Sequence, residues 1–186
     1  MVIIISYTLI IVTIIFLILI ILIYNKFQKL KNGSEASLGQ IKVALKKRLD
    51  LITQLANVVK AYSRFERSVF ENITKMRSLI VKNIKTKDID KININSTGLL
   101  KSIFAVVENY PDIKSSKNYL ELMIALKDVE SDILRQRYTY NNIVQEYNTK
   151  LDVIPSNIVA KIFSYKKLDY LKFKEDLEKL NLEMKD

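Results

Sequence analysis

Apolar residues fill the start of the chain with few interruptions. From Val2 to Tyr24 the sequence reads VIIISYTLIIVTIIFLILIILIY, and none of the first 25 residues is Asp, Glu, Lys or Arg. A helix of this length is roughly 34 Å long, which is enough to cross a hydrocarbon core of about 30 Å. The pattern therefore predicts a transmembrane helix from Val2 to Tyr24.

A cleavable signal peptide is the main alternative for this segment. Such a peptide has basic residues before an apolar core of about 7–15 residues and small residues at its cleavage site. Here no Lys or Arg precedes the apolar run, the run is longer, and Ile23-Tyr24-Asn25 is not a small-residue site. We therefore expect a permanent membrane anchor.

Beyond the anchor, apolar residues recur three or four positions apart. The tripeptide Asn32-Gly33-Ser34 predicts a hinge, so residues 26–37 are expected to be a juxtamembrane linker. The following stripe predicts one helix of about 45–50 residues. Its one skip is at Glu66, and its members are Leu38, Ile41, Leu45, Leu49, Ile52, Leu55, Val59, Tyr62, Val69, Ile73, Met76 and Ile80.

The second half of the chain shows the same spacing after a polar interval. Residues 85–98 (KTKDIDKININSTG) predict turns, and residues 99–108 a short helix that ends before Pro111. A second long helix is expected from residue 115 or 116 to about residue 153. Pro155 is expected to open a further helix, and residues 170–184 to form a last amphipathic helix. The stripe of the second long helix is Tyr119, Leu122, Leu126, Val129, Ile133, Tyr140, Val144, Tyr147 and Leu151.

These patterns predict an all-α protein. Helices with one apolar face each bury those faces against one another, so an N-terminal transmembrane helix followed by an antiparallel helical bundle with two long helices is expected. The predicted domains are the anchor (1–25), the linker (26–37) and the bundle (38–186).

Composition narrows the chemistry. The chain has no Cys and no His, which removes thiol nucleophiles, zinc–thiolate sites, the commonest general base and the Ser–His triad. Three Gly and two Pro leave few turn residues for a many-stranded β protein. We therefore expect no enzymatic activity and no cofactor.

Charge gives a direction to the anchor. Lys26, Lys29 and Lys31 follow the apolar run closely, and Lys42, Lys46, Lys47 and Arg48 extend this basic flank a little further on. Only the α-amino group precedes the run. The positive-inside rule predicts an N-terminus outside and the bundle in the cytoplasm. Tyr24 is expected at the headgroup level. The net charge of +10 is mixed along the chain, which favours a solvated surface or anionic lipid over nucleic acid.

Two glutamates stand within or beside the apolar stripes. Glu66 and Glu130 lie on the two long predicted helices, and we expect a buried polar contact with Arg77, Arg137 or a nearby lysine. The alternatives are a contact for a protein partner and a metal site. Di-metal sites in helical bundles use Glu-x-x-His, and this chain has no His.

Two Tyr-Asn pairs lie seven residues apart. Tyr140-Asn141 and Tyr147-Asn148 therefore share one helical face. A tyrosine-lined ligand groove is one interpretation. We favour rings packed in the bundle, with hydroxyls and amides bonded to neighbouring helices.

Several stretches from the anchor to residue 163 together match a known family pattern. They are Tyr24-Asn25, LKKRLDLI (45–52), VKAY (59–62), Glu66, Arg77, ENYPDIKS (108–115), Tyr119, Glu130, Ile133, Arg137, Tyr140-Asn141, Val144, Tyr147-Asn148, PSNIVA (155–160) and Phe163. At these residues the chain resembles the LemA family. The resemblance implies a single-pass protein with its N-terminus outside and a helical-bundle domain inside. It implies no established catalytic activity, and a relative associated with magnetosome membranes suggests an organising role at membranes. Thr53 stands where the family usually has proline, and Arg64-Phe65 replaces a Lys/His pair.

The sequence thus predicts a membrane-anchored, non-enzymatic scaffold or interaction module. Its expected partners are the lipid bilayer and either another protein or a second copy of the chain. Two alternatives remain: a metal-binding or enzymatic module built on acidic residues, and a basic lipid-organising domain.

Overall fold

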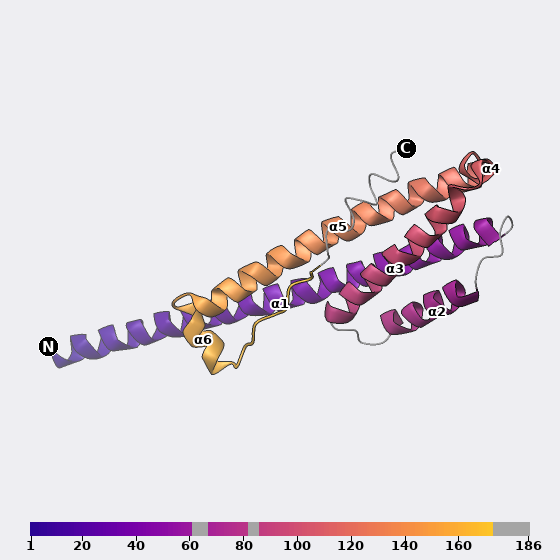
Figure 1. Ribbon diagram of the computed structural model, residues 1–186. Coiled ribbons are helices and arrows are strands. Elements are labelled where there is room, and N and C mark those ends of the chain that lie inside the picture. Colours follow the sequence, from indigo (N-terminus) through magenta and orange to yellow (C-terminus); the bar gives the residue numbers. More distant parts are fainter. Residues whose placement is uncertain (61–66, 82–85, 173–186) are drawn as a thin grey trace. The chain divides into compact units, whose positions relative to one another are not determined.

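The computed structural model describes residues 1–60, 67–81 and 86–172. Its regular elements in these residues are all helices, which confirms the predicted all-α class (Figure 1). They are α1 (Val2–Lys60), α2 (Arg67–Val81), α3 (Thr86–Val107), α4 (Pro111–Lys114), α5 (Lys117–Asp152) and α6 (Ser156–Ile162). The chain divides into two compact units, to both of which α1 and α5 contribute.

The first unit contains Met1–Ala36 and Tyr140–Asp169. Its α1 segment passes through Asn32-Gly33-Ser34 without a break, so the predicted hinge is wrong. Gly33 costs the helix interior only about 1 kcal/mol relative to Ala, which packing of the helix can offset. The hydroxyl of Ser34 donates a hydrogen bond to the carbonyl of Lys31 at 2.7 Å. The predicted boundaries at residues 25 and 37 stay predictions, because the two units are packing regions and do not test them.

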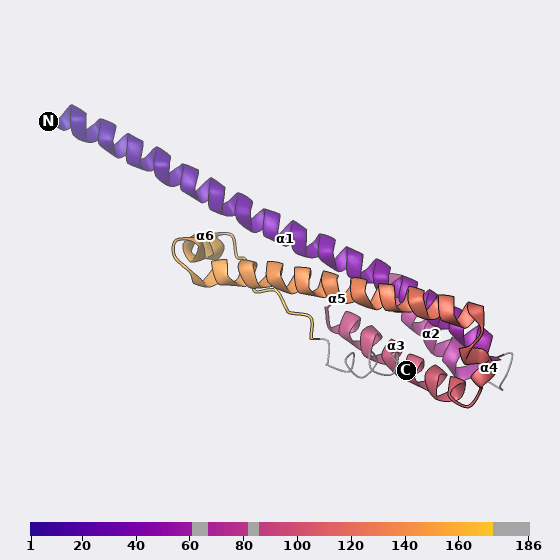
Figure 2. The same ribbon diagram turned by 90° about the horizontal axis from the view of Figure 1, so that it is seen from above.

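The second unit contains the described residues of Ser37–Thr139 together with residues 170–172. Four helical segments lie side by side in it, and successive segments run in opposite directions (Figure 1, Figure 2). They are the second half of α1, α2, α3 and the first half of α5. The predicted antiparallel bundle is therefore confirmed. Its core includes Leu45, Leu49, Ile52, Leu100 and Ile133, none of which has exposed surface.

The first long helix of the bundle differs from the prediction. We expected one helix from residue 38 to residue 80, but Arg77 on α2 contacts Asp50 on α1. In a continuous helix these residues would lie about 40 Å apart. α2 is therefore a separate helix that lies back along α1, and it packs its own apolar face onto the same core.

Residues 85–98 also differ from the prediction. Thr86–Val107 is one helix, so the predicted turn segment is wrong. Ile89 and Ile92 supply its apolar face, and the face continues through the buried polar side chains of Asn93, Ser96 and Thr97. These polar residues tolerate burial because each makes a hydrogen bond inside the bundle.

The later elements follow the sequence more closely. α3 ends before Pro111, α5 matches the second long helix, and α6 begins directly after Pro155. Residues 163–172 contain no helix, and 173–186, the rest of the predicted last helix, lie outside the described residues.

Candidate functional site

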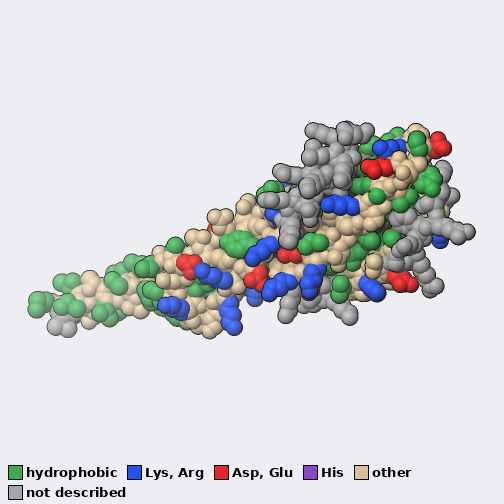
Figure 3. All heavy atoms as spheres, viewed as in Figure 1, with side chains coloured by type: hydrophobic (Ala, Val, Ile, Leu, Met, Phe, Trp, Pro, Cys, Tyr) green, Lys and Arg blue, Asp and Glu red, His purple; other side chains and the backbone are tan. Residues whose placement is uncertain are grey.

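The apolar N-terminal segment keeps its hydrophobic side chains on the outside. The large hydrophobic residues from Ile3 to Leu19 that count as exposed show between 46% and 70% of their surface. α1 is the one described helix that is long and apolar enough to cross a membrane. Figure 3 shows its start as a surface of hydrophobic side chains, with Lys, Arg, Asp and Glu appearing only further along the chain. A protein surface of this kind is stable when lipid covers it.

An aromatic cluster lies where the apolar segment of α1 ends. Phe27 packs edge-on against Tyr147 of α5, with ring centroids 5.5 Å apart. Tyr24 lies 4.8 Å from Phe163, and Phe27 lies 4.8 Å from Tyr165. Phe27 and Tyr147 are buried, so this cluster is the core of the first unit.

Polar contacts surround these rings. Gln28 donates a hydrogen bond to the hydroxyl of Tyr165 at 2.9 Å, and Lys26 forms an ion pair with Glu146 at 2.7 Å. Burial raises the pKa of Tyr147, and the neighbouring Tyr165 raises it further. Both phenols therefore stay protonated at neutral pH and act as packing and hydrogen-bonding groups.

The two Tyr-Asn pairs hold the chain that returns from α6. Asn148 donates from Nδ2 to the carbonyl of Leu168 at 3.0 Å and accepts from the Leu168 amide at 2.9 Å. The hydroxyl of Tyr140 donates to the carbonyl of Asp169 at 2.9 Å. Their partners lie in an extended segment, whereas we expected neighbouring helices. Tyr147 belongs to the aromatic cluster, and Asn141, at the adjoining position, is half-buried.

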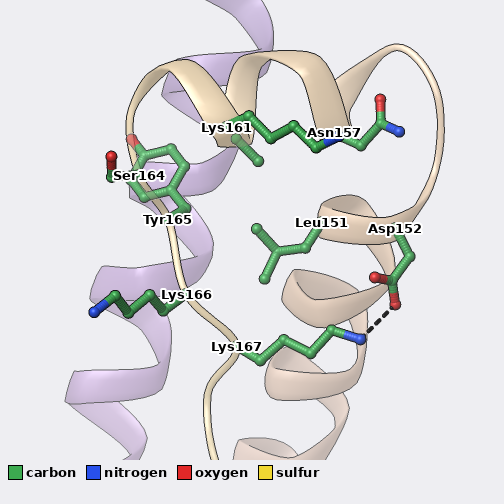
Figure 4. Close-up of a pocket in the computed structure, with 9 residues that line it drawn as sticks. Leu151, Asp152, Asn157, Lys161, Ser164, Tyr165, Lys166 and Lys167 are labelled. Carbon is green, nitrogen blue, oxygen red and sulfur yellow. Dashed lines mark hydrogen bonds and ion pairs between the residues drawn. The ribbon is translucent and has the colours of Figure 1, made fainter.

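A basic hollow opens beside this returning segment. It is lined by residues of α5, α6 and the chain after α6, including Lys161, Lys166 and Lys167. Lys167 forms an ion pair with Asp152 at 2.8 Å. Figure 4 shows that ion pair, with Lys166 pointing away from Asp152 on the other side of the segment.

The buried polar contact predicted from the glutamates is centred on Arg48. From α1, the guanidinium donates to Asn93 Oδ1 at 2.7 Å and to Thr97 Oγ1 at 2.8 Å, both on α3. Its Nε lies 2.6 Å from Oε1 of Glu130 on α5. This Nε–H is not aligned on the carboxylate oxygen, so the last contact is an ion pair and not a linear hydrogen bond.

Burial dominates the electrostatics of this pair. It lowers the pKa of Arg48, and the Glu130 carboxylate partly opposes that change. Burial likewise raises the pKa of Glu130, and Arg48 opposes it. Among the described residues, neither Oε1 nor Oε2 of Glu130 has a hydrogen-bond partner. The contact joins three helices, α1, α3 and α5.

The other predicted members of this contact lie elsewhere. Arg77 binds Asp50 at the surface, close to Thr53. Arg137 lies near Asp90. Burial raises the pKa of the Asp90 carboxyl, and the charge of Arg137 opposes that rise. Glu66 lies outside the described residues. No three acidic side chains in the described ranges gather closely enough to hold a metal ion.

Sequence reasoning missed the role of Arg48. We had interpreted this residue as part of the basic flank of the anchor. Its position was informative, because Leu45, Arg48, Leu49 and Ile52 follow the spacing of a buried helical face.

Comparison with known proteins gives one family. The model of the LemA family matches residues 37–184. Magnetosome protein MamQ 2 of Paramagnetospirillum magneticum is 24% identical over 177 residues, which cover 81% of this chain and 65% of that protein. Protein LemA of Metamycoplasma hominis is 28% identical over 141 residues, which cover 73% of this chain and 63% of that protein.

A third relative is similar to this chain over a comparable length. Magnetosome protein MamQ of Magnetospirillum gryphiswaldense is 23% identical over 174 residues, covering 79% of this chain and 64% of that protein. The chain thus spans just under two thirds of the length of these relatives.

Proposed function

Because this chain belongs to the LemA family, we propose that it is a single-pass membrane protein whose helical bundle serves as a non-enzymatic scaffold or interaction module at the cytoplasmic face. The observation that carries the proposal is the course of α1. One helix, Val2–Lys60, supplies both the exposed apolar segment and the first helix of the bundle. A bundle built in this way is held at the membrane by its own backbone.

The charges near the anchor support the proposed orientation. Lys26, Lys29 and Lys31 are concentrated on the bundle side of the apolar segment. Such residues remain on the cytoplasmic side during insertion. The name of the MamQ proteins links those relatives to magnetosomes, and for this chain it supports a role at a membrane without indicating which one.

The side chains of the bundle favour binding over catalysis. The chain lacks His and Cys, and the buried Arg48–Glu130 ion pair joins α1 to α5. On α5, Leu120 and Ile124 lie one turn apart and are 50% and 64% exposed. Exposed apolar pairs of this kind are suitable contacts for a protein partner or a second copy of the chain.

Crosslinking in native membranes tests this role. A photoreactive amino acid at Leu120 or Ile124 of the full-length chain should give one discrete protein adduct, either a dimer of the chain or a complex with another protein. The same amino acid at Asn118, an exposed position on a different side of α5, is the matched control and should give no such adduct. Monomeric protein with no adduct at either test position would contradict the interaction role.

A further inference from the structure

Residues around α6 expose an unusual number of apolar side chains. Ile154 is 79% exposed, Ile158 54% and Ile162 64%, and Phe163 is also exposed. Ile158 and Ile162 lie four residues apart and so share one face of α6, while Val159 and Ala160 on another face are buried. In water this outer face would leave several large apolar side chains solvated at about 1.5–3 kcal/mol each.

The apolar surface of α6 is continuous with that of the anchor. Phe16, Leu19, Ile20 and Ile23 of α1 line a narrow crevice together with Pro155, Ile158, Val159 and Ile162. All eight lining side chains are hydrophobic. Phe16 to Ile23 is the last third of the apolar segment, so the solvent that surrounds this part of α1 must also surround the outer face of α6.

Groups typical of a membrane interface lie at the edge of this surface. Tyr24, Phe163 and Tyr165 form stacked or tilted ring pairs where the apolar segment ends. Aromatic rings with a polar group favour the headgroup level. Lys161 and Lys166 are exposed there, and neither forms an ion pair within the described part of the chain.

We propose that α6 and its flanking residues, 154–163, form a second membrane contact beside the anchor. Ile154, Ile158, Ile162 and Phe163 lie among the acyl chains of the leaflet on the bundle side, and Lys161 and Lys166 extend to lipid phosphates. The occupant of this surface is thus the bilayer itself. The inference rests on the proposed membrane anchor, since α6 reaches lipid only if α1 crosses it.

Fluorescence quenching tests the proposal on the full-length chain. The chain has no Cys, so a single introduced cysteine takes one fluorophore. Ile154→Cys and Ile162→Cys report on α6, Leu17→Cys on the anchor, and Tyr138→Cys, 62% exposed on α5, on water. The protein is reconstituted in vesicles of phosphatidylcholine and phosphatidylglycerol, with quenching by lipids brominated in the acyl chains or by aqueous iodide.

The expected result is that labels at positions 154 and 162 are quenched by brominated lipid, as the label at position 17 is, and are protected from iodide. The label at position 138 should show the reverse. If iodide quenches positions 154 and 162 while brominated lipid quenches position 17, α6 is in water and the inference is overturned although the anchor stands. If iodide also quenches position 17, the anchor itself fails.

A third pattern also overturns the proposal. Labels at 154 and 162 that neither quencher reaches would mean that protein covers α6, either a second copy or another part of the same chain. Dilution of the protein into excess lipid distinguishes the two, because only self-association is then lost.

The lysine contacts have their own readout. Phosphatidylglycerol should increase the bromolipid quenching of the label at position 162 relative to pure phosphatidylcholine. Lys161→Gln with Lys166→Gln should remove this increase, and Lys91→Gln, an exposed lysine of α3, should keep it. An increase that survives the double substitution would show that these lysines do not bind the phosphates.

Discussion

The guanidinium of Arg48 on α1 lies 2.6 Å from the carboxylate of Glu130 on α5, and both side chains are buried. Asn93 and Thr97 of α3 accept hydrogen bonds from the other two guanidinium nitrogens. Among the described residues, neither carboxylate oxygen of Glu130 accepts a hydrogen bond and Nε of Arg48 donates none, so the two groups interact as an ion pair. Loss of either charge leaves the other buried without its counter-charge.

Removal of the carboxylate should be costly. Glu130→Ala leaves a buried guanidinium without a counter-charge, so we expect the free energy of unfolding to fall by about 3–5 kcal/mol. Urea unfolding of the full chain in detergent micelles, followed by far-UV circular dichroism, measures the change. The double variant Arg48→Met/Glu130→Met should recover most of the loss, because no buried charge remains.

Asp132→Ala is the matched control for that series. Asp132 lies on the same helix and pairs with Arg135 at 2.7 Å, but both side chains are exposed. Such surface pairs contribute about 0–1 kcal/mol. Equal small losses for Glu130→Ala and Asp132→Ala would show that the buried pair is not formed.

The same pair predicts a pH dependence. Burial raises the pKa of Glu130 above its ordinary value of 4.5, with Arg48 opposing the change. The folded state then binds the proton more tightly than the unfolded state. This contribution to stability is complete below pH 4.5 and is lost as the pH rises through the raised pKa.

Glu130→Gln isolates that dependence, because the other carboxylates titrate equally in both proteins. The free energy of unfolding of the unmodified chain minus that of Glu130→Gln should fall with rising pH and then level off. Urea unfolding at a series of pH values measures it. A difference that grows with pH would mean that Arg48 depresses the pKa of Glu130 instead.

Asn148 should control the segment that follows α6. Asn148→Ala removes both hydrogen bonds to Leu168, which are worth about 1–3 kcal/mol when the partners are left unpaired. Hydrogen exchange at the Leu168 amide should accelerate by roughly one to two orders of magnitude. Asn142→Ala, at an exposed position of the same helix, should change nothing. Unchanged exchange in Asn148→Ala would contradict the assignment.

The continuity of α1 at Gly33 is also testable. A Cβ at this position would meet Cδ1 of Ile143 at 3.6 Å, an ordinary contact, and one at Gly39 would meet nothing within 4 Å. Gly33→Ala and Gly39→Ala should therefore each raise the free energy of unfolding by about 0.5–1 kcal/mol in the same urea assay. A loss of stability in Gly33→Ala alone would point to the hinge that the sequence suggested.

Some elements were readable from the sequence because one physical signal dominated. The stripe from Tyr119 to Leu151 predicted α5 because a single face of that helix is buried along its length. Pro111 marked the end of α3 because the preceding residue avoids helical geometry. The charge-free start of the chain marked the candidate membrane span because hydrophobicity is the one dominant signal there, with no charged residue to oppose it.

Other features were misread because two causes give the same pattern. Val59 on α1 and Val69 on α2 both face the core. The buried apolar residues of the two helices therefore continue the same three-or-four spacing along the sequence, although the helices are separate. Asn93 and Thr97 looked like turn residues because sequence does not show that Arg48 is there to bind them. Arg48 itself looked like a flanking charge, since its partner Glu130 lies on a distant helix.

The central claim is that residues 2–24 cross the membrane with the bundle in the cytoplasm. Its most direct test uses the cysteine-free chain with Ser131→Cys, an exposed position of α5, and a membrane-impermeant maleimide added to intact cells. The proposed topology predicts no labelling until the membrane is permeabilised, and full labelling of the membrane-bound protein afterwards. Labelling in intact cells would place the bundle outside and contradict the account.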